Sequence, residues 1–278
     1  MNQSLQERTI EVNEREVFYR YRPGDPDRPT LMLLHGIGDA GQCWAEAFQH
    51  SAMEPFTLVA PDLPGYGNSL PWKESLWALE RFHRLLDALE RVHPIDRLVL
   101  VGHSMGGDIA IRSAMGKANG HYRKIYNIES NITQDDTFLS SEAIKADREG
   151  RFDPWFHSTL PDTIVCKTLG WAFESVRRYH ETLKSADAET FLRDAQGMSE
   201  WITRAAGQRI PRIAAAWRDL PVARVYVHGS TAPPATLKLM QTWDATVWSF
   251  PGTTHWVMID AADAFYERLG RDLETGRD

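Results

Sequence analysis

The sequence predicts an α/β fold in which a parallel β-sheet is flanked by helices. Short, continuous apolar runs, typical of strands buried on both faces, alternate along the chain with amphipathic helical segments. The alternation is interrupted once, between residues 132 and 217, where helical patterns follow one another with no strand between them. We therefore expect a sheet with right-handed crossovers and a helical insertion within it.

Composition and charge argue against a nucleic-acid-binding protein, a membrane-spanning protein and a metal-binding protein. The chain has 278 residues, of which 42% are hydrophobic and 25% charged, and its net charge is −7. The negative charge and the lack of basic motifs argue against a nucleic-acid partner. No apolar run is long enough to span a membrane, and the polar N-terminal segment lacks the apolar stretch of a signal peptide. Cys43 and Cys166 match no metal spacing, so a cytoplasmic protein without bound metal is the simplest expectation.

The first 131 residues are expected to form a hairpin, four buried strands and two helices. The hairpin pairs Arg8–Val12 with Glu16–Tyr21 around Asn13 and Glu14. The strands are short β-favouring runs: Thr30–Leu34, Thr57–Ala60, Arg97–Val101 and Lys124–Glu129. The helices are Glu74–Val92, which carries an apolar stripe, and Asp108–Met115.

Residues 132–217 are expected to form a helical cap, inserted into a core made of residues 1–131 and 218–278. Its helices are expected at Ser140–Glu149, Thr168–Lys184, Asp187–Thr203 and Gly207–Trp217. Most of its many aromatic residues should form the cap's own core, and Trp155, Phe156 and Trp171 are the candidates for a substrate pocket. The core then resumes with strands at Ala223–Gly229 and Thr246–Phe250, and helices at Pro233–Thr242 and Asp263–Leu273.

One motif stands at the junction of an expected strand and an expected helix. Ser104 lies between Gly102 and Gly106 in a Gly-x-Ser-x-Gly pattern, with Arg97–Val101 before it and Asp108–Met115 after it. In that setting the glycines permit a sharp turn, which lifts the serine hydroxyl off the sheet edge towards the first amides of the helix. A chance match would be an ordinary serine in a glycine-rich turn, but the strand–turn–helix context favours a nucleophile.

A serine nucleophile needs a base and hydrogen-bond donors for an oxyanion. Of the ten histidines, His255 is the best placed, because it follows the last expected strand and so lies at the same sheet edge as Ser104. His228, at the end of a strand, is a weaker alternative. The expected oxyanion donors are the backbone amides of Met105, beside the nucleophile, and of Ile37, in the glycine-rich loop after a buried strand. The competing interpretation of His255 is a histidine with a structural role. That of the loop around Ile37 is a glycine turn with no catalytic task.

Four segments together resemble the α/β-hydrolase superfamily with a helical cap: His35–Gly38, Asp62–Ser69, Gly102–Gly107 and Gly252–His255. The resemblance covers nearly all of the expected core. It implies an eight-stranded, mostly parallel sheet and a triad of serine, histidine and an acid.

The acid departs from the common pattern of that superfamily. In most members it follows the next-to-last strand, but here that segment, residues 229–234, contains no carboxylate. Some members, certain dehalogenases among them, place the acid after the strand that precedes the cap, which corresponds to Glu129. Those dehalogenases use an aspartate where Ser104 stands, so the resemblance to them ends at the nucleophile.

Physical reasoning also favours Glu129 as the acid. A carboxylate at the end of an apolar strand is costly unless it is paired, and an imidazole N–H is a natural partner. The alternatives are that Glu129 binds backbone amides or an arginine, and that Asp135 or Asp136 supplies the acid. Asp62, in a Pro-Asp-x-Pro-Gly setting, is expected to be a turn residue.

The residues predict a serine hydrolase that cleaves a carboxylic ester or thioester of a small, apolar or aromatic substrate through an acyl-enzyme, with no metal or organic cofactor. The same fold also serves acyltransferases and cyclising thioesterases of biosynthetic pathways, as well as non-catalytic ligand receptors. The missing acid in residues 229–234 is the one feature that favours a receptor. The substrate, cleavage of a carbon–carbon bond, the oligomeric state and the mobility of the cap are left open by the sequence.

Overall fold

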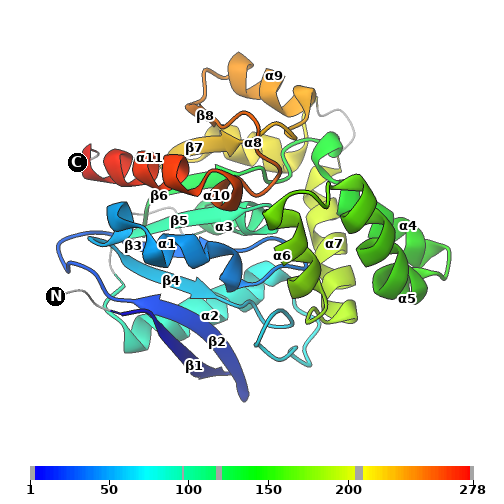
Figure 1. The fold of residues 1–278 in the computed structure, drawn as a ribbon, viewed down its shortest axis with the longest axis horizontal. Coiled ribbons are helices and arrows are strands. Elements are labelled where there is room, and N and C mark those ends of the chain that lie inside the picture. Colours follow the sequence, from blue (N-terminus) through cyan, green and yellow to red (C-terminus); the bar gives the residue numbers. More distant parts are fainter. Residues whose placement is uncertain (1–3, 96, 117–120, 204–208, 276–278) are drawn as a thin grey trace.

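A central sheet organises the computed structural model, which describes residues 4–95, 97–116, 121–203 and 209–275 (Figure 1). Within these residues the sheet has eight strands in the order β1-β2-β4-β3-β5-β6-β7-β8. The pairs β1–β2 and β2–β4 are antiparallel, and all other pairs are parallel. The expected mostly parallel, eight-stranded sheet is confirmed. Its strands are β1 (Gln6–Val12), β2 (Arg15–Arg22), β3 (Thr30–Leu34), β4 (Thr57–Pro61), β5 (Leu98–His103), β6 (Tyr122–Ile128), β7 (Ala223–His228) and β8 (Val247–Ser249).

The N-terminal hairpin forms around the expected turn. Val12 pairs with Arg15, so the connection has two residues, Asn13 and Glu14. Both have positive φ, 54° and 57°. Two consecutive left-handed residues match the right-handed twist of the flanking strands, which is why such turns close tight hairpins.

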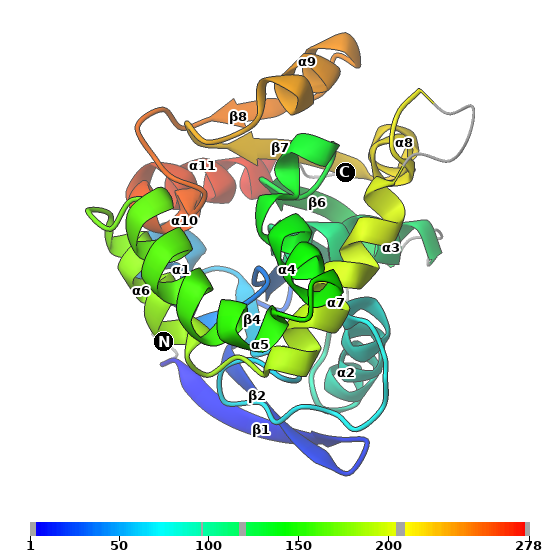
Figure 2. The ribbon, with the colours of Figure 1, turned by 90° about the vertical axis from the view of Figure 1, so that its right-hand side faces the viewer.

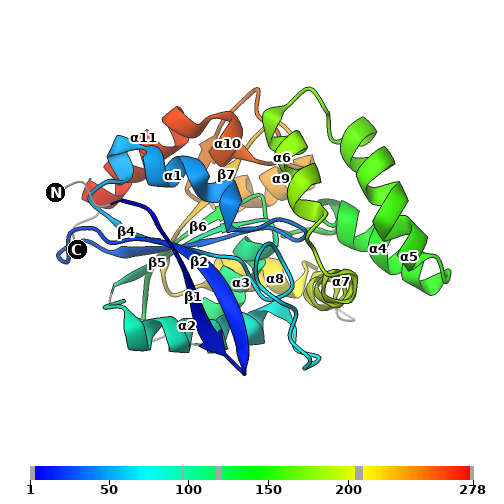
Figure 3. The ribbon, with the colours of Figure 1, turned by 60° about the horizontal axis from the view of Figure 1, so that its bottom comes forward.

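Helices cover both faces of the sheet (Figure 3). Three lie on one face: α1 (Ala45–Gln49), α10 (Val257–Asp260) and α11 (Ala262–Thr275). Three lie on the other: α2 (Ala78–Val92), α3 (Met105–Gly116) and α8 (Arg212–Asp219). A further helix, α9 (Pro234–Thr242), connects β7 to β8. Among the described residues, none of the helices combines the length and the hydropathy that a transmembrane span requires.

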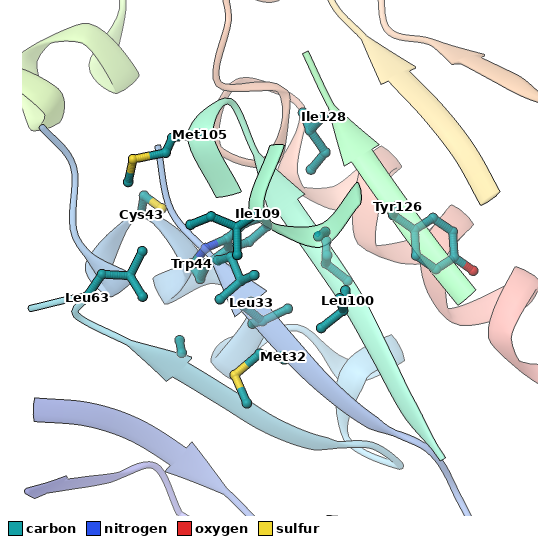
Figure 4. Packing of buried hydrophobic residues seen from close by; sticks show 14 of the residues in the cluster. Met32, Leu33, Cys43, Trp44, Leu63, Leu100, Met105, Ile109, Tyr126 and Ile128 are labelled. Atoms are coloured by element: carbon teal, nitrogen blue, oxygen red, sulfur yellow. The ribbon is translucent and has the colours of Figure 1, made fainter. Parts of the chain in front are cut away.

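The core explains why the central strands read as continuous apolar runs. Every residue of β3 and β5 is buried. Figure 4 shows Leu33 and Leu100 on these neighbouring strands, with Ile109 of α3 packed on one side. All three have at most 1% of their surface exposed. Since helices cover both faces, no position in these strands meets water, and each such side chain contributes about 1.5–3 kcal/mol by burial.

The helical insertion lies beside the sheet, where α4, α5, α6 and α7 stand in front of the strands in Figure 2. Its helical elements are η3 (Gln134–Asp136), α4 (Phe138–Arg148), α5 (Phe152–Pro154), a π-helical segment η4 (Trp155–Thr168), α6 (Glu174–Leu183) and α7 (Ala188–Ile202).

Two expected helices of the insertion need correction. The single helix expected over Thr168–Lys184 is divided, because Gly170 adopts a left-handed φ of 98° that ends the π-helical segment before α6 begins. The helix expected over Gly207–Trp217 begins at Arg212 instead, directly after Pro211. Residues 204–208, including Gly207, lie outside the described residues. Helix α8 packs against α3 of the core, so the expected end of the insertion at residue 217 falls inside a helix.

Helix α2 begins four residues later than the expected start at Glu74, and the reason is a tertiary contact. Asp194 of α7 is fully buried, and its Oδ1 accepts a hydrogen bond from the amide of Ala78 at 3.1 Å. The same carboxylate binds Arg81, one turn further along α2. A carboxylate from the insertion thus caps this helix, and it also fixes α7 to the core.

Candidate active site

Ser104 occupies a strained turn between β5 and α3. Its φ is 50°, in the left-handed region that a serine rarely adopts. The two flanking glycines make the turn possible: a Cβ on Gly102 would lie 2.4 Å from the carbonyl carbon of Gly106, and a Cβ on Gly106 would lie 2.3 Å from the carbonyl oxygen of Leu34. The amide of Ser104 donates to the carbonyl of Ile128 on β6, at 2.9 Å. The turn is therefore held by the neighbouring strand.

Glu129 follows β6 directly and points its carboxylate at three donors. It accepts hydrogen bonds from the amide of Gly229 at 2.6 Å, the hydroxyl of Thr231 at 2.9 Å and Nδ1 of His255 at 2.9 Å. The residue is 5% exposed and has a left-handed φ of 45°. Burial raises the pKa of this carboxyl, but the hydrogen bonds, with that from His255 the strongest, outweigh burial and lower the pKa from its usual value. The group is therefore a carboxylate at neutral pH.

His255 lies in the loop after β8, where the bond to Glu129 fixes its ring. Because Nδ1–H donates to the carboxylate, Nε2 is left as the basic nitrogen. The ring of His103 lies against that of His255, with centroids 4.6 Å apart, and His103 Nε2–H donates to the carbonyl oxygen of His255 at 3.1 Å. Burial, and then the neighbouring His255, hold the pKa of His103 well below its usual value, so His103 stays neutral. A loop histidine is thus oriented from two sides.

Asp135 and Asp136, the alternative candidates for the acid, form no hydrogen bond to the imidazole of His255. The carboxylate of Asp136 accepts from the hydroxyls of Thr133 at 2.9 Å and Thr236 at 2.6 Å, and it forms the capping box of the short helix η3. Asp135 is exposed on the same turn. Asp62, expected to be a turn residue, binds Arg20 at 2.9 Å as well as two backbone amides of the surrounding loops.

The amides of Ile37 and Met105 are available to a ligand. Met105 is the first residue of α3, and Ile37 lies in the loop after β3. Within the described residues neither amide has a hydrogen-bond partner. On the other side of Ile37, its carbonyl accepts a hydrogen bond from the hydroxyl of Tyr179, on helix α6, at 3.1 Å. The insertion thus holds the loop that presents the Ile37 amide.

A second contact joins the same loop to the histidine loop. Asp39 is 3% exposed, and its Oδ2 accepts from the indole N–H of Trp256 at 2.9 Å, while its Oδ1 accepts from the hydroxyl of Thr182 at 3.1 Å. Trp256 is the residue after His255, and Thr182 lies on α6 one turn after Tyr179. No sequence pattern predicted roles for Asp39 and Tyr179. A usable signal for Asp39 was its place in the glycine-rich loop after a buried strand, because a carboxylate there needs hydrogen-bond donors.

The candidate nucleophile, base and acid line one cavity of about 190 Å³. Ser104, His255, Glu129 and Ile37 are on its wall. Much of the remaining lining is apolar or aromatic and comes from both the core and the insertion: Phe138, Leu139, Leu169, Tyr179, Met198 and Trp256. Such a cavity, apolar with a few converging polar groups, is typical of a small-molecule site.

The aromatic residues expected to line the pocket do not line this cavity. Trp155 and Phe156 are 3% and 4% exposed and pack against Phe191, with ring centroids 6.2 Å and 5.1 Å away, so they form the core of the insertion. Trp171 is 42% exposed and lies edge-on to His180. The error arose because large aromatics gain most free energy by packing among themselves, which sequence cannot separate from pocket lining.

Among the described residues, no group of three or more histidine, cysteine, aspartate or glutamate side chains is arranged to hold a metal ion. Both cysteines are free, with Cys43 buried and Cys166 half-buried.

Comparison with known proteins places the fold. A model of the alpha/beta hydrolase family matches residues 31–268. The enol-lactonase from Burkholderia xenovorans LB400 superposes with a TM-score of 0.73 at 17% identity, covering 96% of this chain and 100% of that one. A thermophilic esterase from Thermogutta terrifontis gives a TM-score of 0.71 at 17% identity, covering 97% of this chain and 98% of the esterase. Similarity at this level of identity shows the shared fold.

Sequence relatives align over shorter segments. The lipase LipV of Mycobacterium tuberculosis is 34% identical over 98 residues, which is 35% of this chain and 35% of the lipase. Other curated relatives align over 25% to 40% of their length. The chain therefore matches well under half of each of these proteins.

Proposed function

Because the chain belongs to the alpha/beta hydrolase family, we propose that it hydrolyses a carboxylic ester or thioester of a small, apolar or aromatic substrate through Ser104, His255 and Glu129. The observation that carries the proposal is the 2.9 Å hydrogen bond from His255 Nδ1 to Glu129, on the wall of a cavity that Ser104 shares. The esterase and lactonase folds and the lipase segment described above agree with this reaction class.

In the proposed reaction, the hydroxyl oxygen of Ser104 attacks the carbonyl carbon of the ester while Nε2 of His255 takes its proton. Glu129 keeps Nδ1 protonated and stabilises the imidazolium that forms. The negative charge that develops on the carbonyl oxygen is bound by the amides of Ile37 and Met105, which lack other partners within the described residues.

The tetrahedral intermediate then collapses. His255 gives its proton to the leaving alkoxide or thiolate, and the acyl group remains on Ser104. A water molecule, deprotonated by His255, attacks the acyl-enzyme and regenerates the serine as the acid product leaves. The helices of the insertion serve as the cap, since Leu139 of α4, Tyr179 of α6 and Met198 of α7 lie on the cavity wall.

The test is the hydrolysis of p-nitrophenyl esters with short, long and aryl acyl groups, by the wild type and by Ser104→Ala. We expect turnover by the wild type and a loss of at least about 10⁴-fold in kcat for the variant. Wild-type turnover that survives in Ser104→Ala would contradict the nucleophile. Transfer of the acyl group to an added alcohol that outruns hydrolysis would instead indicate an acyltransferase.

A further inference from the structure

The charges around the cavity are of one sign. No lysine or arginine is among the described residues that line it, whereas four carboxylates are: Asp39, Glu129, Asp135 and Asp136. The two histidines of the lining are His255, which already donates to Glu129, and His103, whose donor is used by a backbone carbonyl. The cavity therefore offers no cationic side chain to an acidic substrate.

Three of the four carboxylates are bound by the protein itself. Glu129 and Asp136 accept the hydrogen bonds described above, and Asp39 accepts from Trp256, Thr182 and the amide of Ala40. Apart from His255, these donors are uncharged, so they orient the carboxylates without neutralising them. Burial raises the pKa of the Asp39 and Asp136 carboxyls, so it works against the negative charge of these two groups.

Asp135 differs from the other three. It lines the cavity, it is exposed, and within the described residues it has no hydrogen bond or ion pair. The same cavity wall carries apolar side chains a few residues further along the chain, Phe138 and Leu139, which do not neutralise a charge. An unpaired carboxylate at the wall of a cavity repels an anion that enters it, and apolar walls of low dielectric strengthen that repulsion.

We propose that this site takes uncharged esters with an apolar acyl chain and discriminates against substrates that carry a second, free carboxylate, and that Asp135 sets this preference. The inference rests on the proposed function, because it describes the substrate of the same site. Neutral polar groups on the wall, namely Asn131, Ser140 and Thr231, can still bind a carbonyl or hydroxyl group of an uncharged substrate.

Two esters of the same shape test the inference: 4-nitrophenyl hydrogen adipate, whose far end is a carboxylate, and its terminal primary amide, whose far end is neutral. The repulsion between two like unit charges about 6 Å apart weakens binding by about 3-fold at an effective dielectric constant of 80 and by about 100-fold at 20. We expect the wild type to prefer the amide by about tenfold in kcat/KM at low ionic strength, and by less at 1 M salt.

The variant Asp135→Asn removes the charge and keeps the shape of the side chain. We expect it to reduce the preference for the amide by about threefold or more. The matched control is Asp162→Asn, another exposed aspartate of the insertion, which does not line the cavity. The control changes the net charge by the same amount and should leave the preference of the wild type unchanged.

Equal kcat/KM for the two esters in the wild type would overturn the inference, and so would an equal response to Asp135→Asn and Asp162→Asn. Either result would leave the proposed function intact, provided that the amide ester is hydrolysed and that Ser104→Ala abolishes its hydrolysis. If neither ester is hydrolysed, the p-nitrophenyl ester series decides the proposed function. Calorimetric binding of benzamide and benzoate then decides the inference, which requires benzamide to bind at least about tenfold more tightly.

Discussion

The carboxylate of Glu129 accepts a hydrogen bond from Nδ1 of His255 at 2.9 Å, although the two residues are 126 positions apart in the chain. Each comes from the loop that follows a strand, Glu129 after β6 and His255 after β8. Because β6, β7 and β8 run parallel, their carboxyl ends meet at one edge of the sheet, where Ser104 also lies at the end of β5.

Replacing Glu129 by glutamine tests the acid. The amide cannot accept from Gly229, Thr231 and His255 together, since one of its two polar atoms is itself a donor. We expect kcat to fall by about 10² to 10⁴-fold with KM changed much less, measured with the best p-nitrophenyl ester. Glu267→Gln, an exposed position on α11, is the control. A near-normal rate in Glu129→Gln with a large loss in Asp136→Asn would move the acid to Asp136.

The pH dependence of activity follows from the lowered pKa of Glu129. Burial raises that pKa, but the hydrogen bonds from His255, Gly229 and Thr231 outweigh burial and hold it below its usual value. We therefore expect Glu129 to add no second protonation to the acid side of the kcat/KM profile until the pH falls to about 4.3, the usual pKa of a glutamate. A slope approaching two above that pH would mean that a second group is protonated and that Glu129 is not held as a carboxylate.

The same shift predicts a contribution to stability. A carboxyl whose pKa is lower in the folded than in the unfolded protein stabilises the fold above the unfolded-state pKa, and this contribution is lost as the pH falls through the folded-state value. We expect the difference in unfolding free energy between the wild type and Glu129→Gln to shrink as the pH is lowered from 6 to below 4.5. Urea denaturation of both proteins measures it, and a difference that grows in acid would contradict the sign of the shift.

The variant Tyr179→Phe tests whether α6 positions the loop of Ile37. The change removes only the hydroxyl that donates to the Ile37 carbonyl at 3.1 Å. A net hydrogen bond of about 1 kcal/mol corresponds to about fivefold, so we expect kcat to fall by about that factor with KM little changed.

Affinity for a trifluoromethyl ketone, which mimics the oxyanion, should fall in parallel with kcat/KM in this variant. Tyr19→Phe is the matched control, because Tyr19 is equally buried and its hydroxyl bonds His93, which does not line the cavity. An equal loss of activity in both variants would indicate a general effect on folding.

Two glycine substitutions test the turn around Ser104. A Cβ on Gly102 would meet backbone atoms of Gly106 and Gly107 at 2.4–2.5 Å, and backbone cannot move away cheaply. We expect Gly102→Ala to lower the melting temperature and to abolish activity. Gly116→Ala, at the end of the following helix, meets nothing within 4 Å and should be neutral or stabilise by about 0.4–1 kcal/mol. Full activity in Gly102→Ala would show that the turn is not needed.

The sequence by itself determined the order and the type of the core elements, because buried parallel strands are locally distinctive. The run Thr30–Leu34 is a strand with the expected bounds, and the strand–turn–helix around Ser104 is present. The same apolar runs predicted that Glu129 and His255 follow strands, and the carboxyl ends of parallel strands lie at one edge of a sheet.

Only the tertiary structure decided which side chains line the cavity and which contacts hold its loops. Trp155 and Phe156 turned to the core of the insertion, while Tyr179 and Met198 reached the cavity, and no local pattern distinguishes these pairs. The contacts of Asp39 with Trp256 and Thr182 join positions up to 217 residues apart. Periodicity reports which face of an element is buried but not against which partner, and so the strands of the sheet follow from the sequence, whereas the walls of the cavity do not.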